Sequence, residues 1–173
     1  MSDLELIPER ERHRTADLTN DSYDGLLRAA LGLNERILLA TWGALALRYN
    51  QTGNPVWKSG ILVLTDERIL LVQPRKKTIT GKVKERPLIE VPLANVFGTG
   101  IHRFITDAVV VEYNASGRYE AHMLSIGEPP RGAPVPSPDA FPDSDYADIW
   151  RVTAIDAAEV RGGTQNLPPG IER

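Results

Sequence analysis

The chain has 173 residues, no cysteine and a formal net charge of −3, and 42% of its residues are hydrophobic. This length fits one domain with tails, and the apolar share is sufficient for a core. The absence of cysteine excludes disulfides, thiolate metal sites and a cysteine nucleophile. The charged N-terminus lacks the apolar region of an export signal, and no apolar run reaches the length of a membrane span. We therefore expect a cytoplasmic protein, with peripheral attachment to a membrane as the alternative.

Charge is unevenly distributed along the chain. Residues 1–30 carry seven acids and four bases, and residues 128–173 carry eight acids and four bases. Residues 31–127 carry eight acids and twelve bases. Two explanations stay open: random variation over a solvated surface, or a basic centre that attracts an anion or is covered by the acidic flanks.

The N-terminal region is predicted to be a polar arm over residues 1–21, followed by a short helix. Asp21 or Ser22 is a suitable helix cap, and Gly32 is a suitable stop. Between them, one side of the predicted helix is apolar. Its residues are Leu26, Leu27, Ala30 and Leu31.

Seven segments are predicted to be strands. Residues 36–47 are rich in Ala and Leu, so periodicity alone leaves helix and strand open there. The others are β-branched or alternating runs bounded by turn residues. The seven segments are 36–47, 60–65, 68–72, 88–91, 95–104, 107–113 and 119–125.

The tight turn between the second and third segments is formed by Thr65, Asp66, Glu67 and Arg68. Thr65 and Asp66 can bond nearby backbone amides, and Arg68 can reach a carboxylate or carbonyl on a neighbouring strand. These residue types suit turn formation better than catalysis.

The last third of the chain changes character. Residues 127–142 contain six prolines, which predicts an irregular connection. An amphipathic helix is expected at about 144–161, with Asp143 as its cap and Gly162 after its end. Its predicted buried stripe is Tyr146, Ile149, Trp150, Ala154, Ala157 and Val160. Residues 162–173 form the predicted C-terminal tail.

Three stretches carry a family resemblance. They are 35–40, the hairpin 60–72 with Leu64-Thr-Asp-Glu-Arg-Ile-Leu70 at its centre, and 89–96. These stretches resemble bacterial pleckstrin-homology-like (PH-like) domains and the related GRAM domains. The resemblance implies an α+β fold over residues 22–161, a partly open barrel of about seven antiparallel strands capped by the C-terminal helix. It is also the reason to assign 36–47 as a strand.

A basic loop is the candidate ligand site. In a PH-like barrel, three strand-connecting loops emerge at one end, and here they carry basic residues. Converging bases attract phosphates or an anionic membrane surface, although a solvated loop explains the same residues. The candidate residues are Arg48, Lys58, Arg75, Lys76, Lys77, Lys82, Lys84, Arg86 and Arg118.

Other classes of site have little support. His13, His102 and His122 are scattered without the spacing of zinc ligands, so we expect no metal. The G-x-G at 98–100 lacks the third glycine and the following helix of a dinucleotide site, and no hydrolase or P-loop motif occurs. The net negative charge and the lack of aromatics in the basic loop disfavour nucleic acid. We expect no cofactor.

The sequence thus favours a non-catalytic binding or scaffolding domain. We expect a protein partner or self-association through a barrel edge, because unpaired edge strands recruit other strands. Binding of anionic lipid or phosphate by residues 75–86 is the alternative, and an unrecognised type of enzyme is the second alternative.

Overall fold

The computed structural model describes residues 31, 34–49, 55–73, 87–102, 108–127, 129 and 145–172. The predicted seven strands and C-terminal helix are confirmed, whereas the N-terminal arm and nearly all of the short predicted helix lie outside the described residues. The elements are β1 (Ile37–Tyr49), β2 (Pro55–Thr65), β3 (Arg68–Val72), β4 (Ile89–Pro92), the 3-10 turn η2 (Leu93–Asn95), β5 (Val96–His102), β6 (Ala108–Ala115), β7 (Arg118–Ile126), helix α3 (Tyr146–Val160) and the 3-10 turn η4 (Gly163–Gln165).

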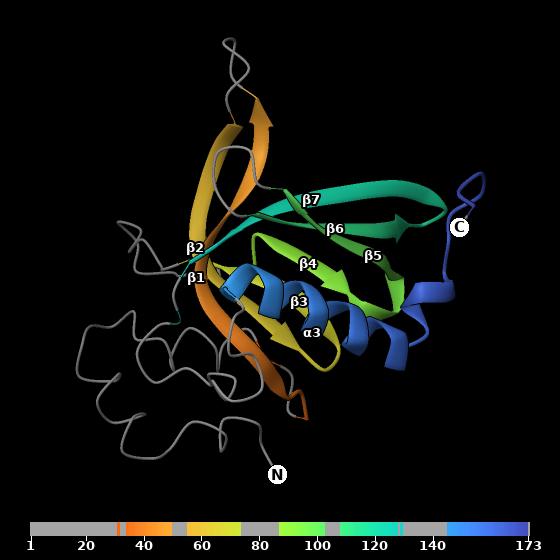
Figure 1. Ribbon diagram of the computed structural model, residues 1–173, viewed down its shortest axis with the longest axis horizontal. Helices are drawn as coiled ribbons and strands as arrows, with labels where there is room; N and C mark the ends of the chain where they lie inside the picture. Colours follow the sequence, from red (N-terminus) through yellow and green to blue (C-terminus); the bar gives the residue numbers. More distant parts are fainter. Residues whose placement is uncertain are drawn as a thin grey trace, which may run out of the picture.

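The strands form one antiparallel sheet in the order β4-β3-β2-β1-β7-β6-β5. Strands that follow one another in the chain are neighbours in the sheet except β4 and β5, and β7 pairs with β1. Strands β4 and β5 form the two edges and do not pair with each other, so the sheet curls without closing. Helix α3 crosses the concave side (Figure 1).

Strand β1 joins the two halves of the sheet. It pairs with β2 along its length but with β7 only at Gly43–Leu45. At this junction a Cβ on Gly43 would collide with the Leu62 side chain and the Ser125 carbonyl oxygen, so a glycine is needed for the close approach. Past the junction, β1 and β2 continue as a two-stranded arm while the β6–β7 hairpin extends away from it (Figure 1).

The inner cluster is the core between the sheet and α3. Side chains alternate across each strand, so every second residue faces the helix. The indole of Trp150 is fully buried in this core, and its Nε1 donates a 2.9 Å hydrogen bond to Thr41 Oγ1 on β1. The buried members are Leu39, Leu45, Leu62, Leu64, Ile69, Leu71, Val91, Leu93, Val96, Val109, Val111, Leu124, Ala147, Ile149, Trp150, Ala154 and Ala158.

The outer cluster is a second apolar group on the opposite face of β1, β2 and β3. It contains none of the helix residues, and its β2 and β3 members alternate with those of the inner cluster. The cluster consists of Ile37, Ala40, Ile61, Val63, Leu70 and Val72, and Leu31 packs against it. Strands buried on both faces have continuous apolar sequences, which explains why residues 61–64 and 69–72 show no polar alternation.

Strands β2 and β6 extend beyond the predicted segments. Strand β2 begins at Pro55 and not at residue 60, because residues 55–59 pair with the end of β1 in the arm. Strand β6 continues to Ala115, so the predicted loop 114–117 is a two-residue turn. Ser116 and Gly117 have φ values of 55° and 89° there, as the favoured hairpin turns require.

Helix α3 also differs in detail. It spans Tyr146–Val160, and its cap is Asp145 and not Asp143: the Asp145 carboxylate accepts a 2.9 Å hydrogen bond from the Asp148 amide. Val160, expected in the buried stripe, is 85% exposed, and Ala158 is buried instead. The helix ends before Gly162 as predicted.

Candidate functional site: a groove between α3 and β1

The β2–β3 turn is held by an ion pair between the partly buried Arg68 and the buried Glu35. Arg68 also reaches a carboxylate on a neighbouring strand, as predicted. Arg68 donates from Nε and Nη2 to the two carboxylate oxygens of Glu35, both at 2.7 Å, and from Nη1 to Glu90 on β4 at 2.6 Å. The Glu35 side chain is 2% exposed. These hydrogen bonds raise the pKa of Arg68, so its guanidinium stays charged over the physiological pH range. The motif therefore has a structural role in the described fold.

The Thr65 side chain completes this turn. Its hydroxyl accepts hydrogen bonds from the amides of Glu67 and Arg68 and lies 2.7 Å from Glu35 Oε1. The Asp66 carboxylate accepts a 2.8 Å hydrogen bond from the Arg36 amide. The predicted bonding of Thr65 to nearby backbone amides is confirmed, whereas Asp66 accepts from an amide 30 positions away in the chain. Together these bonds fix the turn against the start of β1.

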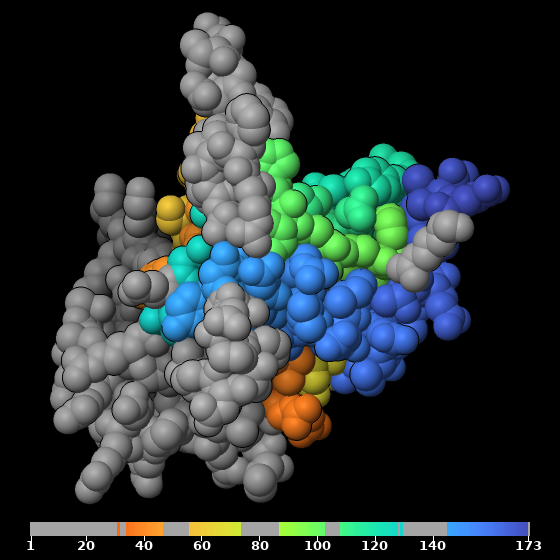
Figure 2. Space-filling view, in the orientation of Figure 1, coloured from red at the N-terminus to blue at the C-terminus, as the bar shows by residue number. Residues whose placement is uncertain are grey.

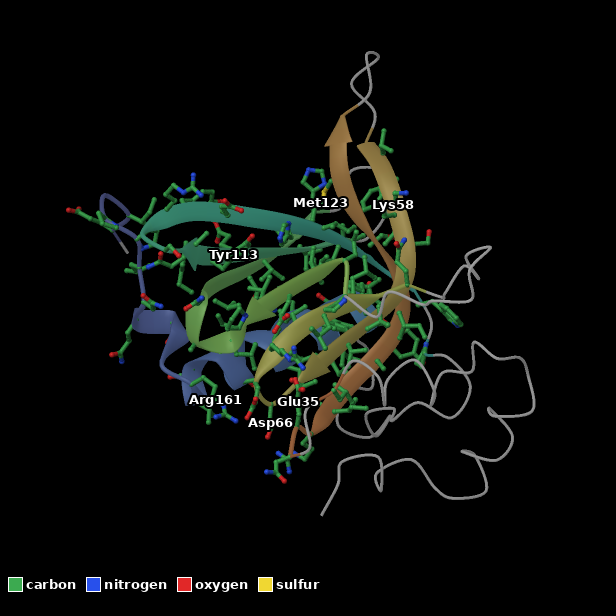
Figure 3. The ribbon with its side chains drawn as sticks, turned by 180° about the vertical axis from the view of Figure 1, so that it is seen from behind. Glu35, Lys58, Asp66, Tyr113, Met123 and Arg161 are labelled. Atoms are coloured by element: carbon green, nitrogen blue, oxygen red, sulfur yellow. The ribbon has the colours of Figure 1, made fainter. Side chains whose placement is uncertain are left out.

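The end of α3 is attached to the same turn by Arg161. Its Nε donates to the Asp66 carbonyl at 2.7 Å, and its Nη2 lies 3.7 Å from Asp66 Oδ2 and 3.9 Å from Glu67 Oε1. Figure 3 shows Arg161 and Asp66 pointing toward each other, with Glu35 beside them. This contact fixes the distance between the helix end and the start of β1.

A groove of about 470 Å³ lies between α3 and the start of β1. In Figure 2, α3 crosses this face of the molecule with β1 directly below it. Apolar side chains line much of the groove, and Arg36 and Asp156 place opposite charges beside them. The lining residues are Arg36, Leu38, Asp66, Val152, Thr153, Asp156, Ala157, Val160 and Arg161.

The same part of β1 is an open strand edge within the described sheet. On the β7 side, its strand pairing ends at Gly43, and one further hydrogen bond joins the Gly127 amide to the Trp42 carbonyl at 2.7 Å. Residues 37–41 have no paired strand on that side among the described strands. Backbone groups that point sideways alternate along a strand, so Ala40 directs its amide and carbonyl to the same side as Trp42.

The predicted basic site falls only partly within the described residues. Lys58 is exposed on β2 and Arg118 is exposed at the start of β7, whereas residues 75–86 and the side chain of Arg48 lie outside. Lys58 pairs with Leu45 of β1, which pairs in turn with Leu124 of β7, so Lys58 and Leu124 lie at the same height in the sheet. Arg118 lies six residues from Leu124, which is roughly 20 Å along the strand. The structure does not bring Lys58 and Arg118 together, and the anion site as a whole stays a prediction.

A polar network occupies the inner side of the β6–β7 hairpin. The Tyr113 hydroxyl donates to Glu120 Oε2 at 2.9 Å and lies 2.9 Å from His122 Nε2. Burial lowers the pKa of His122 against the opposing effect of Glu120, and burial together with Glu120 raises the pKa of Tyr113 to about 12. These bonds join β6 to β7 within the hairpin.

Neither a metal-binding cluster nor a membrane-spanning helix occurs in the part of the chain that the structure describes. No three acidic or histidine side chains there gather in an arrangement that could hold a metal ion. No helix there is long and apolar enough to cross a membrane.

The groove was not anticipated from the sequence. Its lining comes from three separate segments, and residues such as Leu38, Val152 and Ala157 are common in any core. The available signal was Val160, an apolar residue at the end of an amphipathic helix, which was assigned to the core.

The chain has only distant similarity to known proteins. No family model and no curated protein matches it. It is similar to the DH/PH domains of p115-RhoGEF, with 12% identity and a TM-score of 0.44 over 91% of this chain and 42% of that one. It is also similar to the hSac2 domain from human phosphoinositide phosphatase Sac2, with 14% identity and a TM-score of 0.44 over 97% and 88% of the two chains. Neither similarity reaches the level at which a family is assigned.

Proposed function

We propose that this chain is a non-catalytic domain with a PH-like fold that binds an extended segment of a protein partner in the groove between α3 and β1. The observation that supports it most is that the apolar groove lies beside the open edge of β1. An extended segment added there would bond to the backbone of β1 and place alternate side chains in the groove. This mode of recognition is common in domains with an exposed sheet edge.

The composition of the groove fits such a segment. Leu38, Ala157 and Val160 offer contacts to an apolar side chain, and the 85% exposure of Val160 leaves one of them uncovered. Arg36 and Asp156 at the margin suit a segment with charges of both signs. The Arg161–Asp66 contact joins the end of α3 to the β2–β3 turn beside the groove, and a preformed groove reduces the ordering cost of binding.

The PH-like assignment is supported by the strand order, the position of the helix and the Thr65–Arg68 turn. A non-catalytic role is supported by the sequence, which has no nucleotide-binding or hydrolase motif. Self-association is the same proposal with a second copy supplying the segment. A cytoplasmic location is consistent with this use and is part of the proposal.

The test uses an array of nine-residue peptides of varied sequence, probed with the full chain. Peptides that bind are measured in solution against the Val160→Glu variant, which adds a charge to an exposed position of the groove. Ala121→Glu, at an exposed position on β7 away from the groove, is the matched control. We expect at least tenfold weaker binding with Val160→Glu and none of this loss with Ala121→Glu.

Backbone chemistry tests the strand-addition step separately. In an added strand, every second residue would donate its amide to β1. N-methylation of those residues should weaken binding, whereas N-methylation of the residues between them should not. An array without any binder, or binding that Val160→Glu leaves unchanged, would contradict the groove. Sedimentation with anionic vesicles in place of peptide binding would favour the lipid alternative.

A further inference from the structure

Two of the charged side chains that line the groove lack a charged partner within the described part of the chain. Arg161 lies 3.7 Å from Asp66 Oδ2 and 3.9 Å from Glu67 Oε1, so these charges compensate one another. The side chains of Arg36 and Asp156 form no ion pair or hydrogen bond with a described residue, and both residues are exposed. The groove therefore offers a ligand a positive charge at the start of β1 and a negative charge on α3.

Helix α3 runs antiparallel to the start of β1, and contacts at two levels fix the alignment. Trp150 is hydrogen-bonded to Thr41. Arg161 donates to the carbonyl of Asp66, whose amide donates to the carbonyl of Arg36. The helix rises about 16 Å between residues 150 and 161, and an extended chain spans about 17 Å between residues 36 and 41. The two lengths agree, so each level of α3 corresponds to a level of β1.

The two charges without partners lie at different levels of the groove. Asp156 is about 7.5 Å along the helix from Arg161, which lies at the level of Arg36. Side chains on one face of a strand are two residues, or about 7 Å, apart. In a strand added along β1, one side chain would therefore lie beside Arg36 and the next on the same face beside Asp156.

Strand β7 indicates the direction of such a segment. It pairs antiparallel with β1 on the side of the open edge, and its last pair joins Ile126 to Gly43. A segment that continues this arrangement is also antiparallel to β1, which is the slightly more stable pairing. Its N-terminal part then lies near Thr41 and its C-terminal part near Arg36.

We propose that the groove selects extended segments in which a basic residue is followed two positions later by an acidic residue. The base lies beside Asp156 and the acid beside Arg36. The inference rests on the proposed function, which places an extended segment along β1, and it adds the order of the charges and the direction of the chain. A segment with the reverse order meets like charges at both positions, and such repulsion gives specificity.

Two nine-residue peptides with blocked ends test the order of the charges. Both have leucine at positions two and eight and threonine at the odd positions. One has lysine at position four and glutamate at position six, and the other has these two exchanged, so the compositions are identical. By titration calorimetry at low salt, the full chain should bind the lysine-first peptide at least fivefold more tightly. The difference should shrink as salt is raised, because exposed charges are screened.

Charge reversal in the groove should reverse the preference. With Arg36→Glu and Asp156→Lys combined, the glutamate-first peptide should bind at least fivefold more tightly than the other. Glu159→Lys is the matched control, because Glu159 is exposed on α3 but does not line the groove, and it should leave the preference unchanged. If the double variant unfolds, Asp156→Lys alone gives the decision, because it should abolish the preference.

The outcomes separate this inference from the proposed function. Equal binding of the two peptides, weakened by Val160→Glu, would overturn the order of charges and leave the groove as a binding site. Tighter binding of the glutamate-first peptide to the wild-type chain would overturn the direction of the segment. Failure of both peptides to bind would also overturn the inference, and the peptide array would then decide whether the groove binds any extended segment.

Discussion

The indole nitrogen of Trp150 in α3 donates a hydrogen bond to the hydroxyl of Thr41 in β1, although 109 positions separate the two residues in the chain. Both side chains are almost fully buried, at 0% and 1% exposure. A buried indole N–H without an acceptor is costly, so this bond sets the position of α3 over the sheet. One wall of the candidate groove depends on that position.

The first prediction concerns this contact. Trp150→Ala should lower the free energy of unfolding by about 3–5 kcal/mol, because it removes the largest core side chain and leaves a cavity. Trp150→Phe should cost about 1–3 kcal/mol, since it leaves the Thr41 hydroxyl unpaired. Urea denaturation followed by circular dichroism measures both.

Trp42 is the matched control for Trp150. It lies on the same strand as Thr41 but is 47% exposed, so Trp42→Ala should change stability by no more than about 0.5 kcal/mol. If the two alanine variants unfold at the same denaturant concentration, α3 is not docked as described.

The second prediction concerns the ion pair of Arg68 and Glu35. Glu35→Gln keeps the shape of the side chain but leaves the guanidinium without its buried counter-charge, so we expect a loss of about 3 kcal/mol, at the lower end for a broken buried pair. Glu90→Gln removes a carboxylate that is 49% exposed and should cost less than about 1 kcal/mol. If both variants lose the same free energy of unfolding, the burial of Glu35 is not what makes its ion pair with Arg68 stabilising.

Local features of the fold were predictable from the sequence. The turn at Thr65–Arg68 is specified by residues within hydrogen-bonding reach of one another. The sequence did not identify Glu35 as the carboxylate that binds Arg68, because the two residues are 33 positions apart in the chain. The start of β2 was not predictable in this way, because residues 55–59 are strand only through pairing with β1. Pro55 and the polar Lys58 and Ser59 favour a loop locally.

The groove was harder to predict from the sequence than the fold. Periodicity shows that a helix has an apolar side, but it does not show where the sheet beneath that side ends. Val160 was assigned to the core for this reason, and it lies in the groove. The continuous run Ile61–Leu64 indicated burial, yet only the structure shows that its alternate members belong to two separate clusters.

The third prediction concerns pH. Burial lowers the pKa of His122 in the folded chain, so the unfolded chain, with an ordinary histidine pKa of about 6.5, binds the proton more readily. The stability that neutral His122 contributes is then fully present above about pH 6.5 and declines as the pH falls below that value. His122→Gln should remove this part of the decline between pH 7.5 and 5.5. Parallel pH profiles for wild type and His122→Gln would argue against the effect.

The last prediction concerns the basic loop and decides between partners. If residues 75–86 bind anionic lipid, the wild-type chain should sediment with phosphatidylserine vesicles at low salt. Each base near such a surface contributes only about 1 kcal/mol, so binding needs several bases together, and replacing Lys76, Lys77, Lys82 and Lys84 with Gln should abolish it.

Arg151→Gln is the control for this measurement, because Arg151 lies on α3 and is not among the candidate basic residues. Its loss should weaken sedimentation by no more than a few-fold. Binding should also weaken as salt is raised, since exposed charges are screened beyond about 8 Å at physiological ionic strength. Wild-type chain that stays in solution with these vesicles at low salt would leave the groove between α3 and β1 as the remaining candidate, and light scattering across a concentration series would then show whether a second copy occupies it.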